Sequence, residues 1–185
     1  MRKGLLSPLL PDETAGSIRE VDFEKEYERG VRGVIFDIDN TLVPHGQPAD
    51  EMVLTFFEKL KECGLKYCLI SNNSEERVKP FADAAGAFYV FKAGKPLKKG
   101  YIRAMEEMGT RPEESLFVGD QLFTDVFGAK RAGIRCILVN PIDPDTDPPF
   151  VVFKRKMEGF LKKRKIWENK VKSLKNTAGR REKHG

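Results

Sequence analysis

The segment "VIFDIDNTLV" (residues 34–43) joins a short apolar run to two aspartates, Asp37 and Asp39, which stand one residue apart. The apolar run is typical of a buried strand. Side chains alternate along a strand, so both carboxylates would leave the same face, roughly 7 Å apart. Two like charges in this arrangement repel each other and are costly to remove from water. The segment therefore predicts a strand whose end is used for chemistry rather than for stability.

Short apolar runs recur along the chain, and helical patterns lie between them. The runs lack the in/out alternation of a half-exposed strand, as expected for strands covered on both faces. They are "VIF" (34–36), "YCLI" (67–70), "FYVF" (88–91), "LFV" (116–118) and "CILV" (136–139). Helices are predicted over about 50–64, 74–86, 96–109 and 123–133. Strands that alternate with helices form parallel βαβ units, so we expect an α/β fold with a doubly wound, mainly parallel five-stranded sheet.

Composition divides the chain into four parts. These are an N-terminal arm (1–30), a catalytic core (31–140), a Pro/Asp-rich linker (141–149) and a basic amphipathic tail (150–185). No apolar run approaches the ~18 residues of a membrane span. Pro8 interrupts the basic and apolar start, which does not predict a cleaved signal peptide. The three cysteines are expected to be free thiols, and the protein is expected in the cytoplasm.

Polar side chains follow the apolar runs at the points where strands end. Ligands of open parallel sheets bind beyond the carboxyl ends of the strands, so these side chains should converge on one crevice. They are Asp37, Asp39, Ser71, Asn72, Asn73, Lys95, Asp120 and Asp125. Carboxylates, a hydroxyl and an ammonium group make a poor core but suit a divalent cation and a phosphate. Mg²⁺ prefers oxygen ligands, including one or two protein carboxylates, and nothing in the sequence separates it from Mn²⁺.

The same side chains suit phosphoryl transfer. An aspartate can attack phosphorus and form an aspartyl-phosphate. A second carboxylic acid two residues along the chain can protonate the leaving oxygen and then deprotonate the attacking water. Ser71 can hydrogen-bond the phosphoryl oxygens, and Lys95 can neutralise charge in the transition state.

Four segments, in this order, resemble the motifs of the haloacid dehalogenase (HAD) superfamily of phosphotransferases: "DIDNTLV", "SNN", "KP" and "GDQLFTD". The resemblance implies a HAD-like Rossmannoid fold and a Mg²⁺ cofactor. It implies that Asp37 is the nucleophile and a metal ligand. Asp39 would be the general acid and base, and its backbone carbonyl would bind the metal.

The resemblance also implies roles for the later motifs. Ser71 and Lys95 would hold the phosphate. Apart from the resemblance, the position of Asn72 and Asn73 before Ser74 leaves two roles open for them: contact with the substrate or capping of the following helix. Asp120 would bind the metal, and Asp125 would be a ligand or support one.

Motif spacing bears on access to the site. Members of the superfamily often carry a cap domain after the first motif or between the second and third. Here 29 residues separate Thr41 from Ser71 and 23 separate Ser71 from Lys95, and one helix and one strand nearly fill each interval. We therefore expect no cap domain and a site that is open, or closed only by a partner. Thr41 is expected to orient Asp39, while Asn40 replaces a glycine that is frequent in this motif.

Over nearly the whole chain, the sequence resembles the YqeG-type group of HAD subclass IIIA. The resemblance rests on "LLPDETAGSI", "GDQLFTDV" and "FKRKMEGFLKKRK". This group is similar to mitochondrial and plastid phosphatidylglycerophosphate phosphatases. The resemblance thus implies hydrolysis of phosphatidylglycerophosphate to phosphatidylglycerol. Two alternatives remain: the same chemistry on a soluble sugar, nucleotide or phosphoprotein, or an RNA- or ribosome-associated binding protein.

The charge of the chain is unevenly distributed. Residues 154–185 carry 13 lysines and arginines against 3 acidic residues, whereas the residues before them carry 20 against 25. Between 153 and 175, one helix face would hold Phe153, Met157, Phe160, Arg164, Trp167, Val171 and Leu174. This face is expected to bind the anionic inner surface of a membrane, peripherally. Docking on the chain's own domain is the alternative, and nucleic acid is less favoured because few aromatics are available for stacking. The oligomeric state is not predicted.

Overall fold

The computed structural model describes residues 7–163, which contain a six-stranded parallel sheet in the order β1-β6-β5-β2-β3-β4. The strands are β1 (Glu13–Thr14), β2 (Gly33–Phe36), β3 (Lys66–Ile70), β4 (Phe88–Val90), β5 (Ser115–Gly119) and β6 (Arg135–Leu138). The predicted doubly wound parallel sheet is confirmed, but the count of five strands was one short. The missed strand, β1, has two residues and no apolar run of its own, and it forms by pairing with the edge of β6.

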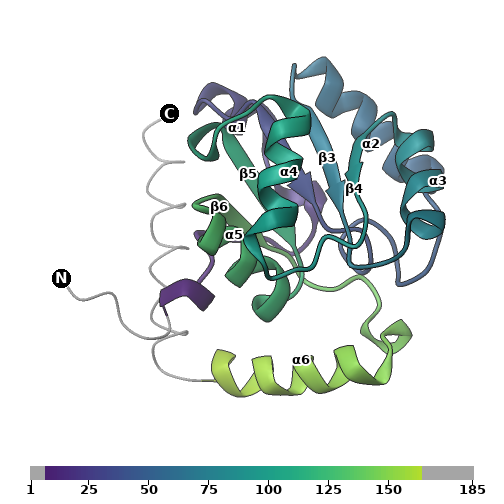
Figure 1. The fold of residues 1–185 in the computed structure, drawn as a ribbon, viewed down its shortest axis with the longest axis vertical. Helices are drawn as coiled ribbons and strands as arrows, with labels where there is room; N and C mark the ends of the chain where they lie inside the picture. The colour runs from purple at the N-terminus through teal and green to yellow at the C-terminus, as the bar shows by residue number, and fades with distance from the viewer. Residues whose placement is uncertain (1–6, 164–185) are drawn as a thin grey trace.

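In the described part of the chain, six α-helices connect and flank the strands (Figure 1). They are α1 (Phe23–Glu28), α2 (Glu51–Glu62), α3 (Glu75–Ala85), α4 (Lys98–Met108), α5 (Phe127–Ala132) and α6 (Pro149–Lys162). Asp50 caps α2, because its side chain accepts a 2.8 Å hydrogen bond from the amide of Val53. Gly86 ends α3 in the left-handed conformation. The helix predicted from about residue 96 begins at Lys98, so Pro96 precedes it.

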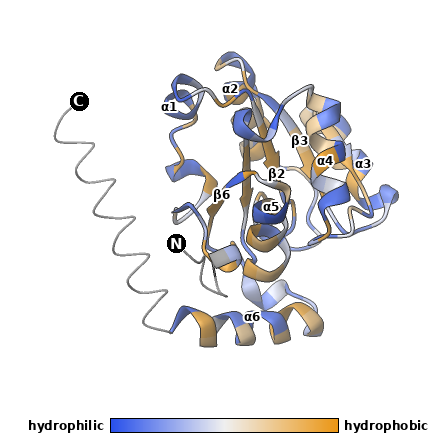
Figure 2. Cartoon of the chain, turned by 60° about the vertical axis from the view of Figure 1, so that its left-hand side comes forward, coloured by the Kyte–Doolittle hydropathy of each residue, from blue (hydrophilic) through white to orange (hydrophobic). Residues whose placement is uncertain are grey.

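Two apolar layers, one on each face of the sheet, form the core. On one face, α1, α2 and α3 pack through residues such as Phe23, Phe57 and Phe81. On the other face, α4 and α5 pack through residues such as Tyr101 and Ala129. Both faces are therefore buried, which explains why the strands are continuously apolar (Figure 2).

The segment predicted as an N-terminal arm is bonded to the sheet. Asp12 accepts a 2.9 Å hydrogen bond from the backbone amide of Cys136, and its carboxylate pairs with Lys130. Buried Glu26 pairs with Arg29 and with Arg135 at the start of β6. These contacts attach the described part of the arm to the β6 edge.

Beyond β6 the chain turns back across the carboxyl ends of the strands. The segment 140–148 includes a short 3-10 turn, Pro144–Thr146, and leads into α6, which lies along that edge of the sheet (Figure 1). Among the helices within residues 7–163, none has both the length and the hydropathy that a membrane crossing requires. α6 thus lies beside the strand ends that carry the predicted site residues (Figure 1).

Candidate active site

Three carboxylates from two strand ends form the centre of the site. Asp37 follows β2, whereas Asp120 and Asp125 follow β5, the strand next to β2 in the sheet. One oxygen from each carboxylate lies within 4.8 Å of the others, and all three residues are buried. The parallel sheet therefore brings together three of the four aspartates that were predicted to bind the metal. The fourth, Asp39, was expected to bind it through its backbone carbonyl.

Lys95 lies among these carboxylates. Its ammonium nitrogen is 2.8 Å from Asp125 Oδ1 and also pairs with Asp37. The side chain of Asn72 binds the backbone of Lys95: it accepts a hydrogen bond from the Lys95 amide at 2.7 Å and donates one to the Lys95 carbonyl at 3.1 Å. This pair of bonds assigns Asn72 a contact with Lys95; contact with substrate stays a prediction.

The electrostatics of the cluster favour an additional cation. Burial, with repulsion from Asp125 and Asp120, raises the pKa of the Asp37 carboxyl, although Lys95 opposes this. Burial and Asp125 likewise raise the pKa of Asp120 to about 7. Burial lowers the pKa of Lys95, but attraction to Asp125 and Asp37 outweighs it and leaves that pKa raised. Three buried carboxylates with one ammonium between them fit an oxygen-preferring divalent cation such as Mg²⁺.

A short π-helix (η4, Leu122–Val126) shapes the loop after β5. Its Asp125 turns back, so that Oδ2 accepts from the amides of Asp120 at 3.2 Å and Gln121 at 3.0 Å. A Cβ at Gly119 would lie 2.6 Å from Asp125 Oδ2, which explains the glycine that begins "GDQLFTD". Asp125 therefore supports the loop as well as facing the other carboxylates, and π-turns of this kind are frequent at functional sites.

The side chain of Asp39 is held apart from the three-carboxylate cluster. It accepts hydrogen bonds from Asn73 Nδ2 at 2.7 Å, Arg77 Nη2 at 3.1 Å and the Gly46 amide at 2.9 Å. Neither Arg77 nor the contact from Asn73 was predicted. The arginine in the first turn of the helix that follows "SNN" could have indicated such a contact with Asp39. Asp39 thus has an environment separate from that of Asp37, which is compatible with the different roles predicted for the two residues.

Two hydroxyl groups of the motifs have defined partners. Ser71 is buried, and its Oγ accepts from the Asn73 amide at 3.1 Å. Thr41 was expected to orient Asp39, but its Oγ1 donates to Asp120 Oδ1 at 3.3 Å. The expectation for Thr41 was wrong because the tight turn after β2 directs this side chain toward β5.

The prediction of an open site is wrong for the described residues. Arg155 of α6 reaches the centre, where its Nη2 lies 2.5 Å from Asp120 Oδ2 while its Nε pairs with Asp147. Glu158, also on α6, accepts from the Leu122 amide at 2.7 Å and the Phe123 amide at 3.1 Å. α6 therefore covers Asp120 and the loop after β5. Sequence reasoning missed Arg155 and Asp147 because both lie outside the four motifs.

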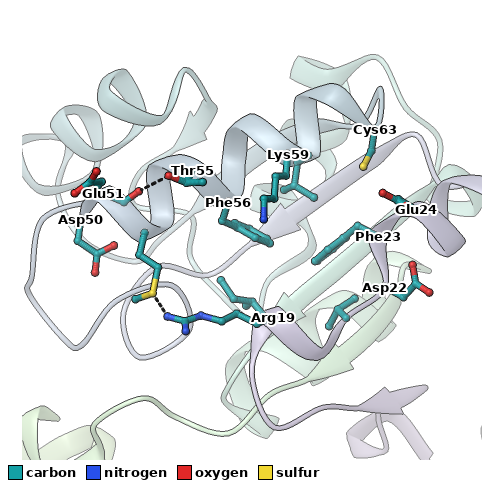
Figure 3. Close-up of a pocket in the computed structure, with 14 residues that line it drawn as sticks. Arg19, Asp22, Phe23, Glu24, Asp50, Glu51, Thr55, Phe56, Lys59 and Cys63 are labelled. Atoms are coloured by element: carbon teal, nitrogen blue, oxygen red, sulfur yellow. Dashed lines mark hydrogen bonds between the residues drawn. The ribbon is translucent and has the colours of Figure 1, made fainter.

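A separate pocket of about 880 Å³ lies between α2 and the N-terminal segment. Figure 3 shows Phe23 and Phe56 lining it, with Arg19 and Lys59 nearby. None of its lining residues belongs to the four motifs, and its charges are of both signs. The residues predicted for catalysis and metal binding therefore lie in the carboxylate cluster and its surroundings and not in this pocket.

Known proteins are similar to this chain in sequence. A family model of haloacid dehalogenase-like hydrolases matches residues 45–133. The probable phosphatase YqeG of Bacillus subtilis is 41% identical over 150 residues, which make up 80% of this chain and 87% of that protein. The chloroplastic phosphatidylglycerophosphate phosphatase 1 of Chlamydomonas reinhardtii is 29% identical over 173 residues, covering 85% of this chain and 62% of that protein.

A solved structure has the same fold. It is the cobalt-bound form of deoxy-D-mannose-octulosonate 8-phosphate phosphatase from Haemophilus influenzae, which matches with a TM-score of 0.51 and 15% identity. The match covers 71% of this chain and 77% of that one. At this identity, the likeness shows the fold alone.

Proposed function

The chain belongs to the haloacid dehalogenase-like hydrolases and is a phosphoric monoester hydrolase, and we propose that it converts phosphatidylglycerophosphate to phosphatidylglycerol with Mg²⁺ as cofactor. The observation that carries the catalytic part is the buried cluster of Asp37, Asp120 and Asp125 with Lys95 among them. The relatives named for phosphatidylglycerophosphate support the lipid part, although they are more distant than the bacterial phosphatase.

The proposed reaction has two steps. First, a carboxylate oxygen of Asp37 attacks phosphorus and forms an aspartyl-phosphate, while Asp39 gives its proton to the departing oxygen of the headgroup. Second, Asp39 takes a proton from water, and that water attacks phosphorus. Inorganic phosphate leaves and the Asp37 carboxylate is regenerated.

Other side chains bind and orient the phosphoryl group in this scheme. Ser71 donates its hydroxyl to a phosphoryl oxygen, and the Lys95 ammonium neutralises charge that develops there. Mg²⁺, held by Asp37, Asp120, Asp125 and the backbone carbonyl of Asp39, would neutralise further negative charge on the phosphoryl oxygens.

The exposed face of α6 supports a lipid substrate. Phe150, Phe153, Met157 and Phe160 are 64%, 65%, 46% and 71% exposed, and they lie on the side of the helix opposite to Val151, Arg155 and Glu158. A helix that docked by its apolar stripe would bury these four residues. α6 docks by its other face and leaves the apolar stripe outward. Along the helix, hydrophobic residues alternate with hydrophilic ones (Figure 2).

We place this outward face in the interface of an anionic membrane. Lys154 lies beside the stripe, with its ammonium 3.9 Å from the Phe150 ring centroid, and Lys163 flanks the other side. Apolar side chains bordered by lysines match the interior and headgroup layers of such a surface. Residues 164–175 of the predicted 153–175 surface lie outside the described residues. In this proposal the protein is cytoplasmic and binds the inner face of the membrane peripherally.

Phosphate release from phosphatidylglycerophosphate tests the substrate and the nucleophile together. The wild type should release phosphate in the presence of Mg²⁺, and Asp37→Asn should release none while its circular dichroism stays native. Asp83→Asn, an exposed aspartate on α3, is the matched control and should keep full activity. Activity retained by Asp37→Asn would overturn the nucleophile assignment.

A panel of soluble sugar, nucleotide and protein phosphates tests the alternative substrate class. Phosphoglycolate phosphatases of Pseudomonas species, which match 42% of this chain, keep that class open. A higher kcat/KM for any soluble compound than for the lipid in vesicles would favour the alternative.

Vesicle binding tests the role of α6. The double variant Phe153→Ser with Phe160→Ser should bind less to vesicles that contain phosphatidylglycerol, whereas Ile102→Ser, an exposed apolar residue on α4, should bind as the wild type does. Binding that is equal for all three, or that appears with ribosomes but not with vesicles, would contradict a membrane role.

A further inference from the structure

Arg155 lies between two buried carboxylates that come from different parts of the chain. Its Nη2 is 2.5 Å from Asp120 Oδ2, and its Nε pairs with Asp147 Oδ2. The side chains of Asp120, Asp147 and Arg155 are only 0%, 2% and 15% exposed. Two well-separated donors of one planar guanidinium are therefore in use, a geometry that lysine cannot reproduce.

Asn40 fixes the position of Asp147, the second carboxylate that Arg155 binds. Asn40 Nδ2 donates to Asp147 Oδ1 at 2.8 Å, and Asn40 Oδ1 accepts from the Asp143 amide at 2.9 Å. The Asn40 carbonyl accepts from the Ile142 amide at 3.1 Å. Asp147 thus has a fixed orientation, and so has the guanidinium that it binds.

Asp120 is constrained on both of its oxygens. Thr41 Oγ1 donates to Oδ1 at 3.3 Å, and Arg155 donates to Oδ2. Asp120 is completely buried, so bulk solvent does not reach its carboxylate and these two protein donors orient it. Arg155 is the stronger of the two donors, since it carries a charge and approaches more closely.

We propose that Arg155 is a positioning residue for the metal site: it fixes the Asp120 carboxylate in the orientation that binds the divalent cation, so that α6 is part of the catalytic centre. The inference rests on the proposed function, because it takes Asp120 as a ligand. Side chains that hydrogen-bond a metal ligand orient it, and their loss weakens metal binding.

A purely mechanical role for Arg155 would duplicate contacts that α6 already makes. Val151 is buried under the helix, and Glu158 accepts from the amides of Leu122 and Phe123. Burying an arginine only to anchor a helix is costly, because the cation must leave water. The position of the guanidinium against a ligand carboxylate accounts for that cost.

Calorimetric titration with Mg²⁺ separates positioning from anchoring. Arg155→Gln should bind Mg²⁺ on the order of 10-fold more weakly than the wild type, and Arg155→Lys should lie between the two. Val151→Ala trims an apolar contact of α6 while the bonds of Glu158 and Arg155 still hold the helix, and Lys156→Gln removes a neighbouring exposed charge; both should bind Mg²⁺ as the wild type does. Unchanged affinity in Arg155→Gln, or an equal loss in Val151→Ala, would overturn the proposal.

Kinetics with p-nitrophenyl phosphate give a second readout. The rate of Arg155→Gln should approach that of the wild type as the Mg²⁺ concentration rises, because a metal site of lower affinity still fills at a high metal concentration. A deficit that is the same at all Mg²⁺ concentrations would mean that Arg155 contacts the substrate instead.

A further variant, Asp147→Asn, keeps the test informative even if Arg155→Gln does not fold. Asp147→Asn leaves Arg155 in place but weakens its support, so it should show a smaller loss of Mg²⁺ affinity than Arg155→Gln. If the wild type binds no divalent cation, the proposed cofactor is wrong together with the role of Arg155. If the wild type binds Mg²⁺ and neither variant loses affinity, only the role of Arg155 is wrong.

Discussion

Asn40 and Asp147 are separated by 107 positions in the chain, yet a 2.8 Å hydrogen bond joins Asn40 Nδ2 to Asp147 Oδ1. The bond links the first catalytic motif to the segment that leads into α6. Asn40 is fully buried and has a φ of 63°, a left-handed conformation that asparagine tolerates better than most residues. Asparagine at this position therefore combines the backbone freedom that glycine would supply with two side-chain contacts that glycine lacks.

Substitution of Asn40 should separate these two contributions. Asn40→Gly keeps the backbone conformation but loses the bonds to Asp147 and to the Asp143 amide, so we expect its free energy of unfolding to fall by about 1–2 kcal/mol. Asn40→Ala loses the same bonds and adds backbone strain of about 1 kcal/mol or more. Urea denaturation should rank the wild type above Asn40→Gly, and Asn40→Gly above Asn40→Ala. The reverse order for the two variants would contradict the left-handed conformation.

Replacement of Lys95 should expose the repulsion among the three carboxylates. Lys95→Met removes the ammonium from a buried cluster, and breaking such a pair costs about 3–5 kcal/mol of stability. Added Mg²⁺ should then stabilise the variant more than the wild type, because the cation relieves uncompensated charge. Thermal unfolding with and without Mg²⁺ measures both effects.

A matched control for this prediction is available on α3. Lys79→Met breaks an exposed ion pair with Asp83, so it should change stability little and should not alter the response to Mg²⁺. If Lys95→Met and Lys79→Met behaved alike, the buried cluster could not be a site of unbalanced charge.

Arg77 should affect the acid and base steps without affecting the nucleophile. Arg77→Gln removes a 3.1 Å contact to Asp39 Oδ1 but leaves Asp37 and Lys95 untouched. p-Nitrophenol is a good leaving group that needs little protonation, so rapid phosphorylation of Asp37 should persist as a burst. Steady-state turnover should fall by roughly 10-fold or more, because positioned proton transfer contributes at least that much.

Rapid-quench kinetics would detect the burst of p-nitrophenol in this experiment. Arg103→Gln, on the exposed side of α4, serves as the control and should leave both phases unchanged. Loss of the burst itself in Arg77→Gln would mean that Arg77 acts on the first step.

Two truncations should divide the functions of the C-terminal part. A chain that ends at residue 163 keeps α6 and Arg155, so it should hydrolyse p-nitrophenyl phosphate as the full chain does, while binding anionic vesicles less well because most basic residues of the tail are gone. A chain that ends at residue 148 loses Arg155 and Glu158, and its hydrolysis of the soluble compound should also fall. Equal activity of both truncations on the soluble compound would place α6 outside the catalytic centre.

Much of the fold and of the candidate site could be predicted because the decisive signals are local. Each core strand is a continuous apolar run, and Asp37, Ser71 and Asp120 follow strand ends directly. Since parallel strands align their carboxyl ends, strand type alone brought these side chains to one edge. Lys95 lies in the loop that follows β4, so it could be placed at the same edge, although its pairing with Asp125 depends on the π-turn after β5.

The sequence by itself determined the parallel sheet, the order of the catalytic residues and the presence of an apolar stripe on the tail helix. Only the tertiary structure decided which side of that helix faces the site. The spacing of apolar residues along a helix defines an apolar and a charged face, but it does not define which face packs against the domain. The choice depends on partners for the charged side chains, which Arg155 finds in Asp120 and Asp147 and Glu158 finds in two free amides of the loop after β5. Buried charges must be paired, so distant polar contacts turned the charged face inward and left the apolar one outside.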